Sequence, residues 1–112
     1  MIRLTVLYNL PEGTDEAEFL RWRLGEHQVA NASAPGVLRT DFGRVTERWT
    51  PEYHLAPSPY RFMTIVEYPD REIFERSFYA ATPDQGDNDL ARITDTLFIV
   101  TEILASTINA EA

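Results

Sequence analysis

Cysteine is absent from the chain, and this absence limits both its chemistry and its surroundings. Without cysteine there is no disulfide, no thiolate nucleophile and no thiolate metal ligand. The two histidines, His27 and His54, are far apart in the sequence, and no calcium-loop pattern of aspartates and glycine is present. We therefore expect no metal and no cofactor, and we expect the protein to reside in a reducing cytoplasm.

Basic residues are few, since ten lysines and arginines stand against eighteen aspartates and glutamates, for a net charge of −8. This charge repels a phosphate backbone and no basic run offsets it, so nucleic acid is not an expected partner. Long apolar runs are missing as well, because none approaches the roughly 20 residues of a membrane-spanning helix. The start of the chain alternates between apolar and polar residues, unlike the core of a signal peptide. We expect no membrane partner.

The composition that remains is that of a folded protein. The 112 residues suffice for one domain, with 44% hydrophobic, 12% aromatic and 25% charged residues. We expect this domain to cover residues 1–105 and residues 106–112 to form a frayed tail.

The pattern of apolar residues predicts four strands and two main helices. Expected strands are 2–9, 37–45, 60–68 and 96–104, and expected helices are 15–30, 71–81 and a short 83–93. Thr14 or Asp15 is the candidate N-cap of the first helix, and Asp70 is that of the second. The apolar stripe of the first helix is expected to be Ala17, Leu20, Leu24 and His27, widened by Phe19 and Trp22. The stripe of the second helix is expected to be Ile73, Phe74, Ser77 and Phe78. Residues 49–59, with three prolines, are expected to form a loop.

The order strand, helix, strand, strand, helix, strand predicts an α+β fold of the ferredoxin-like type, a split βαβ duplication. Its four-stranded antiparallel sheet carries both helices on one face. We expect the other face to hold Leu7, Phe98 and Val100, which are too apolar to remain in water. We therefore expect a homodimer in which two such faces pair.

Several segments, in their order and spacing, resemble the EthD family of small dimeric α/β-barrel proteins. The resemblance rests on the strand 2–8, Phe19 eight residues before His27, Pro35-Gly36 eight residues after it, Phe42-Gly43-Arg44-Val45, and the stretches 81–86 and 90–91. Val29 departs from the family, which often has proline two residues after the histidine. The resemblance implies two ferredoxin-like subunits around a barrel-like cavity. Superfamily relatives include polyketide cyclases, muconolactone isomerases, cofactor-independent monooxygenases and haem enzymes, so the fold alone does not fix the activity.

The histidines are the candidate acids and bases, because their ordinary pKa suits proton transfer near neutrality. His27 on the helix stripe is either such a group or a structural histidine near a helix end. His54 lies among the aromatic residues of the expected loop, and it is either a cavity residue or a solvated one. Arg39 is a candidate anchor for a developing enolate. Arg44 is an alternative, and strand alternation places the two arginines on opposite sheet faces unless Gly43 forms a bulge.

The expected ligand is a small hydrophobic molecule, aromatic or polyketide-like, bound in the dimer cavity. The candidate lining residues are Thr5, Leu7, Asn9, Trp49, Tyr53 and Tyr60. Three activities stay open: a cofactor-free cyclase, isomerase or lyase using His27, His54 and Arg39; a non-catalytic binding or accessory protein; and a cofactor-independent monooxygenase using Asn9, Trp49 and an arginine.

Overall fold

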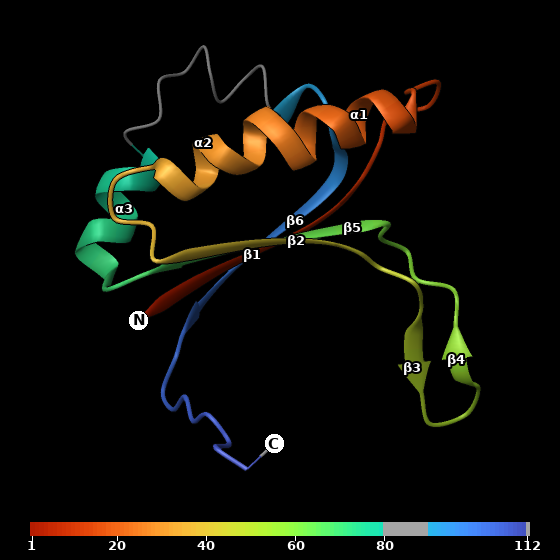
Figure 1. The fold of residues 1–112 in the computed structure, drawn as a ribbon. Helices are drawn as coiled ribbons and strands as arrows, with labels where there is room; N and C mark the ends of the chain where they lie inside the picture. The colour runs from red at the N-terminus through yellow and green to blue at the C-terminus, as the bar shows by residue number, and fades with distance from the viewer. Residues whose placement is uncertain (80–89, 112) are drawn as a thin grey trace.

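A computed structural model describes residues 1–79 and 90–111 of the chain. The strands are β1 (Ile2–Asn9), β2 (Arg39–Arg44), β3 (Arg48–Thr50), β4 (His54–Ala56), β5 (Phe62–Tyr68) and β6 (Thr94–Glu102). The helices are α1 (Glu16–Trp22), the π-helical turn η1 (Arg23–His27), α2 (Gln28–Ser33) and α3 (Arg71–Tyr79). Four strands form one antiparallel sheet in the order β2-β5-β1-β6, and the helices cover one face of it (Figure 1). The expected α+β ferredoxin-like fold is confirmed.

The core lies between this sheet and the helices. In β1 the side chains of Ile2, Leu4, Val6 and Tyr8 are buried, and each is followed by a more exposed residue. This period of two is the signature of a strand with one face in the core. Across the sheet the buried row continues into Phe62, Thr64 and Val66 of β5.

The first helical segment begins at the expected N-cap, because the side chain of Asp15 accepts a hydrogen bond from the backbone N–H of Glu18. The predicted stripe is partly wrong, since Ala17 and Leu24 are exposed. Phe19, which was expected only to widen the stripe, is buried, and its ring centroid lies 5.5 Å from that of Phe62. A large aromatic side chain buries more apolar area than alanine or leucine, so it decides how the helix is rotated.

The second helix follows its prediction more closely. The side chain of Asp70 accepts a hydrogen bond from the backbone N–H of Ile73, which confirms Asp70 as the cap, and Phe74 is buried. The expected end of this helix and most of the short helix 83–93 fall in residues 80–89, outside the described residues.

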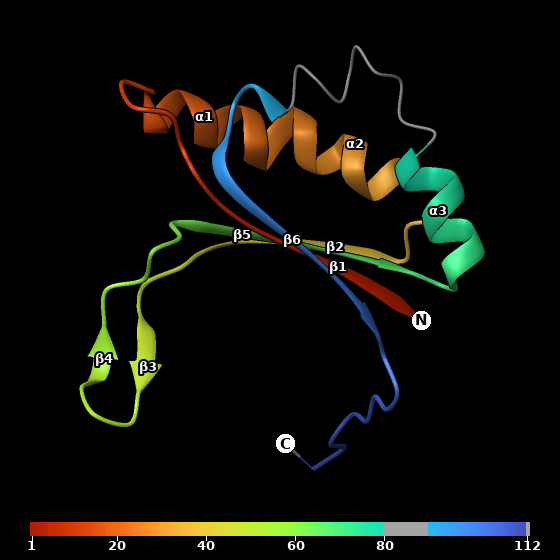
Figure 2. The same ribbon diagram turned by 180° about the vertical axis from the view of Figure 1, so that it is seen from behind.

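The segment 49–59 is not the loop that its prolines predict. β3 and β4 pair in it as a short hairpin, with Trp49 opposite Leu55 and Thr50 opposite His54. Its prolines lie in the turn and after β4, where no ladder hydrogen bond needs their missing N–H. The hairpin leaves the sheet on the side opposite the helices, as Figures 1 and 2 both show.

The last strand also differs from its prediction. It covers residues 94–102, and Phe98 and Val100 pair with Val6 and Leu4, whose side chains face the helices. The expectation that Phe98 and Val100 lie on the open face was therefore wrong. Leu97 and Ile99 occupy the open face instead, opposite Leu7 and Thr5.

Beyond Glu102 the chain forms no further strand or helix up to residue 111, and the separate tail at 106–112 stays a prediction. Among the described helices, none has the length and apolar character needed to cross a membrane.

Candidate functional site

The face of the sheet turned away from the helices, here called the open face, carries two kinds of side chain. Strand alternation and pairing place on it Arg3, Thr5, Leu7, Arg39, Asp41, Gly43, Met63, Ile65, Glu67, Leu97, Ile99 and Thr101. Its centre is apolar, and Leu97 and Ile99 leave 40% and 41% of their surface exposed in the single chain. A contiguous apolar surface of this kind marks a contact with another molecule.

A charged row crosses one end of the open face. Glu67 on β5 is directly opposite Arg3 on β1 and Arg39 on β2. Its carboxylate oxygens lie 3.5 Å from Nη2 of Arg3 and 3.8 Å from Nη1 of Arg39, and the residue is buried. Arg39 also holds Asp41 at 2.8 Å. Two guanidinium groups beside an apolar surface form an arrangement that can anchor an anionic oxygen of a ligand.

The candidate residues Arg39, Thr5 and Leu7 share this face. The pairing of β2 with β5 is continuous through Gly43, so Gly43 forms no bulge. Arg39 and Arg44 therefore lie on opposite faces, and Arg39 is the arginine on the open side.

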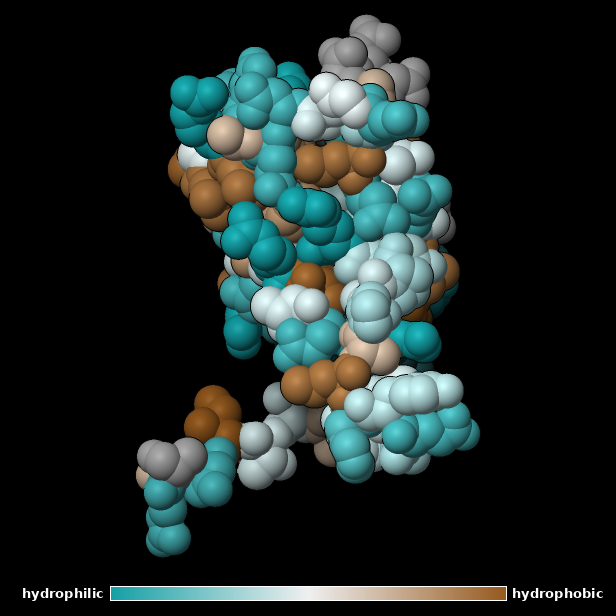
Figure 3. Space-filling model, turned by 90° about the vertical axis from the view of Figure 1, so that its right-hand side faces the viewer, coloured by the Kyte–Doolittle hydropathy of each residue, from teal (hydrophilic) through white to brown (hydrophobic). Residues whose placement is uncertain are grey.

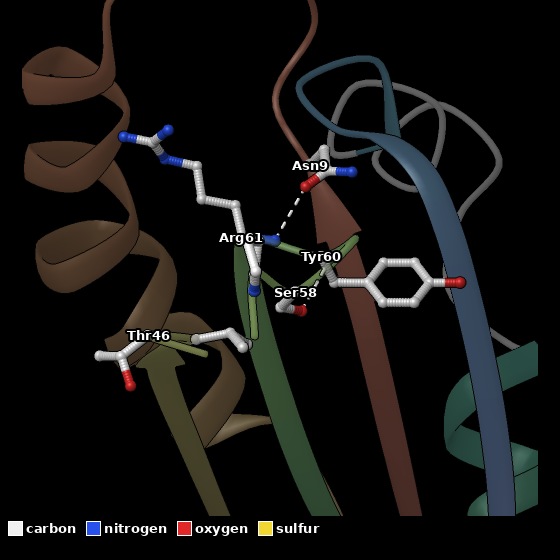
Figure 4. A pocket seen from close by; sticks show the side chains of 7 residues that line it. Asn9, Thr46, Ser58, Tyr60 and Arg61 are labelled. Atoms are coloured by element: carbon white, nitrogen blue, oxygen red, sulfur yellow. Dashed lines mark hydrogen bonds between the residues drawn. The ribbon is translucent and has the colours of Figure 1, made fainter. Parts of the chain in front are cut away.

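A pocket of about 320 Å³ lies at the far end of the sheet, where β1 and β2 end and β5 begins (Figure 4). It is lined by Asn9, Val45, Thr46, Pro57, Ser58, Tyr60 and Arg61, and so contains two of the predicted ligand residues, Asn9 and Tyr60. Its volume is at the small end of the range for ligand pockets.

Asn9 in this pocket is already engaged by its own chain. Its Oδ1 accepts a hydrogen bond of 2.8 Å from the backbone N–H of Arg61, and its Nδ2 donates to the carbonyl of Pro59 and to Asp95. These bonds tie the end of β1 to the segment before β5 and to the start of β6. The geometry supports a structural role for Asn9.

Arg61 points from the pocket rim toward α1, where it forms an ion pair with Glu16. The hydrogen bond from Arg61 lowers the pKa of the Glu16 carboxyl, against a smaller opposing effect of desolvation, and the charges of Arg61 and Arg44 lower this pKa further. The same hydrogen bond raises the pKa of Arg61. Both groups keep their charges near neutral pH.

His27 lies elsewhere, in the helical layer at the end of η1. Its ring is 4.3 Å from that of Trp22, centroid to centroid, at an angle of 32°. The guanidinium of Arg92 lies 4.2 Å from the centre of the same Trp22 ring. The sheet separates this layer from the open face (Figure 1).

The other aromatic candidates, Trp49 and Tyr53, are on the hairpin with His54, and all three are exposed. None of them lines the pocket of Figure 4. The three predicted catalytic residues thus occupy three places in one chain: the helical layer for His27, the hairpin for His54 and the open face for Arg39.

A buried polar network between the helices and the sheet was missed by sequence reasoning. Arg23, only 2% exposed, donates from Nη1 to Oε1 of Gln28 at 2.6 Å and from Nη2 to Oγ1 of Thr64 at 3.1 Å. The hydroxyl of Tyr8 is hydrogen-bonded to the same Thr64 oxygen at 3.0 Å. The guanidinium also lies 4.4 Å from the centre of the Phe42 ring. Its signal in the sequence is the spacing of four between Phe19, Arg23 and His27, which places all three on one helix face.

In the described parts of the chain, residues 1–79 and 90–111, no three histidine, aspartate or glutamate side chains gather in a way that could hold a metal ion.

No protein-family model matches the sequence, and no curated protein matches it either. Solved structures do match. HapK from Hahella chejuensis has a TM-score of 0.72 at 19% sequence identity, covering 98% of this chain and 99% of its own. An EthD-family protein from Bacillus halodurans has a TM-score of 0.68 at 19% identity, covering 93% and 99%. A dimeric ferredoxin-like protein of unknown function from Jannaschia sp. has a TM-score of 0.61 at 13% identity, covering 92% and 100%. The chain therefore shares the ferredoxin-like fold of these structures.

Proposed function

We propose that the chain forms a homodimer through its open faces and binds a small hydrophobic molecule, aromatic or polyketide-like, in the space between them. One observation carries the proposal: the open face combines an exposed apolar centre with a row of charged groups at one end. An apolar centre without polar groups would support pairing alone. The row of Arg3, Glu67 and Arg39 adds groups that can orient a ligand.

Pairing of two copies is supported by the fold of the similar structures, one of which is a dimeric protein. It is also supported by charge. Each chain carries −8, so two copies repel one another at most orientations. The open face is balanced, with Arg3 and Arg39 against Asp41 and Glu67, and is thus a surface on which a second copy can approach.

Catalysis by a cofactor-free isomerase, cyclase or lyase is a second candidate, favoured by the position of Arg39. Its guanidinium faces the proposed cavity and can stabilise a developing enolate oxygen. The general acid or base would have to be His54, because the sheet separates His27 from the space between the open faces. The monooxygenase alternative is supported less, because the amide group of Asn9 is used within its own chain.

A matched pair of variants tests the main proposal. Ile99→Asp places a charge on the open face, and Val100→Asp places the same charge on the other face of the same strand, at almost equal exposure, 41% against 44%. The wild type should sediment as a dimer at micromolar concentration and bind 1-naphthol, measured by calorimetry. Ile99→Asp should be a monomer with naphthol affinity reduced by about tenfold or more, because a buried unpaired charge is strongly unfavourable.

Val100→Asp should remain a dimer and keep its naphthol affinity. A wild-type chain that is monomeric would refute the pairing. A dimer that binds naphthol no better than the Ile99→Asp variant would refute the ligand cavity and leave the pairing intact.

A further inference from the structure

The β3–β4 hairpin exposes large apolar side chains, which the described residues of its own chain leave mostly uncovered. Trp49, Tyr53 and Leu55 are 65%, 71% and 65% exposed. Aromatic side chains of this size bury about 150–250 Å² each when they are covered, so their exposure is unusual for a free surface.

The hairpin has a defined shape. Its strands pair over three residue pairs, Arg48 donates from Nε to the carbonyl of Pro57 at 3.0 Å, and the Thr50 hydroxyl accepts a hydrogen bond from the backbone N–H of Tyr53 at 3.0 Å. His54 closes the turn with a φ of 60°, a left-handed conformation that few non-glycine residues adopt. The aromatic side chains are therefore presented on an ordered element.

The direction of the hairpin relates it to the proposed dimer. It projects past the open face, on the side away from the helices, and the C-terminal segment 103–111 leaves the sheet on that side too (Figures 1 and 2). Both extend beyond the body of the molecule in the space-filling view of Figure 3. The C-terminal segment also exposes apolar side chains, Leu104 at 88% and Ile108 at 91%. A second copy seated on the open face would lie between these two projections.

We infer that the hairpin of each chain is a clasp that packs on the partner copy and closes one end of the space between the two open faces. The inference rests on the proposed dimer. The molecule that the hairpin contacts is a second copy of the chain, because the hairpin lies on the same side of the sheet as the open face, whose charges are balanced. In this arrangement Trp49, Tyr53 and His54 border the cavity of the dimer from the partner chain. These three residues do not line the pocket of their own chain, but in the dimer they contribute to the site of the partner.

Tryptophan fluorescence tests the clasp, because the sequence has two tryptophans and Trp22 lies within the helical layer of its own chain. The signal of Trp49 is isolated as the difference between the wild type and Trp49→Phe, and again directly in Trp22→Phe. Acrylamide is the quencher, since it is uncharged and unaffected by the charge of −8. Trp49 should be quenched several-fold less in the dimer than in the monomeric Ile99→Asp variant, and its emission should shift to the red in that variant.

Two leucine-to-serine substitutions then measure how much the hairpin contributes to the stability of the dimer. Leu55→Ser should raise the dimer dissociation constant by about tenfold or more, because central apolar contacts dominate interface energies. Leu24→Ser removes a leucine of similar exposure, 61% against 65%, from the helical layer, and should leave the dissociation constant unchanged within about twofold.

The outcomes separate the two proposals. A wild-type dimer whose Trp49 is quenched as strongly as in the Ile99→Asp monomer would overturn the clasp and leave the dimer standing. Trp49 protection that persists in that monomer would show that the hairpin folds onto its own chain, and would also overturn the clasp. A wild type that is monomeric would overturn both.

Discussion

The hydroxyl of Thr64 joins two buried groups, the guanidinium of Arg23 and the phenol of Tyr8. We expect Thr64→Val, which keeps the side-chain shape but removes the hydroxyl, to lower the free energy of unfolding by about 1–3 kcal/mol, because both partners lose a hydrogen bond where water cannot replace it. Urea denaturation measures this. Thr64→Ser should lose less, since it keeps the hydroxyl. Thr96→Val, at an exposed threonine of β6, should change stability by no more than about 0.5 kcal/mol.

Arg23 also shows where residue-level prediction stops. The spacing of Phe19, Arg23 and His27 was available in the sequence, but arginine is so rarely buried that the pattern favoured Leu20 and Leu24. The structure makes the burial possible through acceptors supplied by Gln28 and by Thr64, which is distant in sequence. Such partners are brought together only by the fold, so no local pattern predicts them. The caps Asp15 and Asp70 were predictable because their partners are three residues away.

The connection between α2 and β2 sets how closely α3 packs. Gly36 there has a φ of +85°, and a Cβ atom on it would overlap with Cγ2 of Ile73 on α3. The hydroxyl of Ser77, on the same helix, donates to the carbonyl of Pro35 at 2.8 Å. We expect Gly36→Ala to lower the free energy of unfolding by about 1–3 kcal/mol, from backbone strain and overpacking together.

Gly25 provides the matched control for this element-scale prediction. It lies within η1, and a Cβ atom there would meet nothing within 4 Å. Gly25→Ala should therefore be neutral or raise the free energy of unfolding by up to about 1 kcal/mol. Equal losses for the two variants in thermal or urea denaturation would show that the close approach at Gly36 does not limit the packing of α3.

Elements differed in how far the sequence determined them. β1 alternates strictly and was predicted to the residue. The prediction assigned Phe98 and Val100 of β6 to the wrong face of the sheet. The residues from 97 to 100 are all apolar, and a continuous apolar run does not indicate which residues face which side. Pairing with β1 decides it. The hairpin was not predicted, because the three prolines of its segment indicated a loop. Prolines at turns and strand ends are nevertheless compatible with short strands.

At the scale of the molecule, the candidate site residues of a single chain lie in separate places. The open face holds Arg39, Thr5 and Leu7, while the pocket at the far end holds Asn9 and Tyr60. The ferredoxin-like order of strands and helices could be predicted because it depends on local periodicity. A site shared between copies depends on a surface match, which periodicity does not encode. The proposed dimer would bring Arg39, Thr5 and Leu7 of both copies to one enclosed space between the open faces.

The charge of the whole molecule gives the proposed dimer a defined response to salt. Two chains of −8 repel one another over distances longer than any single contact, whereas the open faces that would meet are balanced. Salt should therefore weaken the repulsion between the two negatively charged chains more than it weakens the attraction between their open faces. We expect the dissociation constant, measured by sedimentation, to fall several-fold between about 0.02 and about 0.3 M NaCl, because the screening length becomes about fourfold shorter over this range. Near the isoelectric point of about 4.6 the net charge nearly vanishes, and this salt dependence should largely disappear. Weaker association at high salt near neutral pH would contradict the argument, because it would mean that attractive ion pairs between copies dominate the interface.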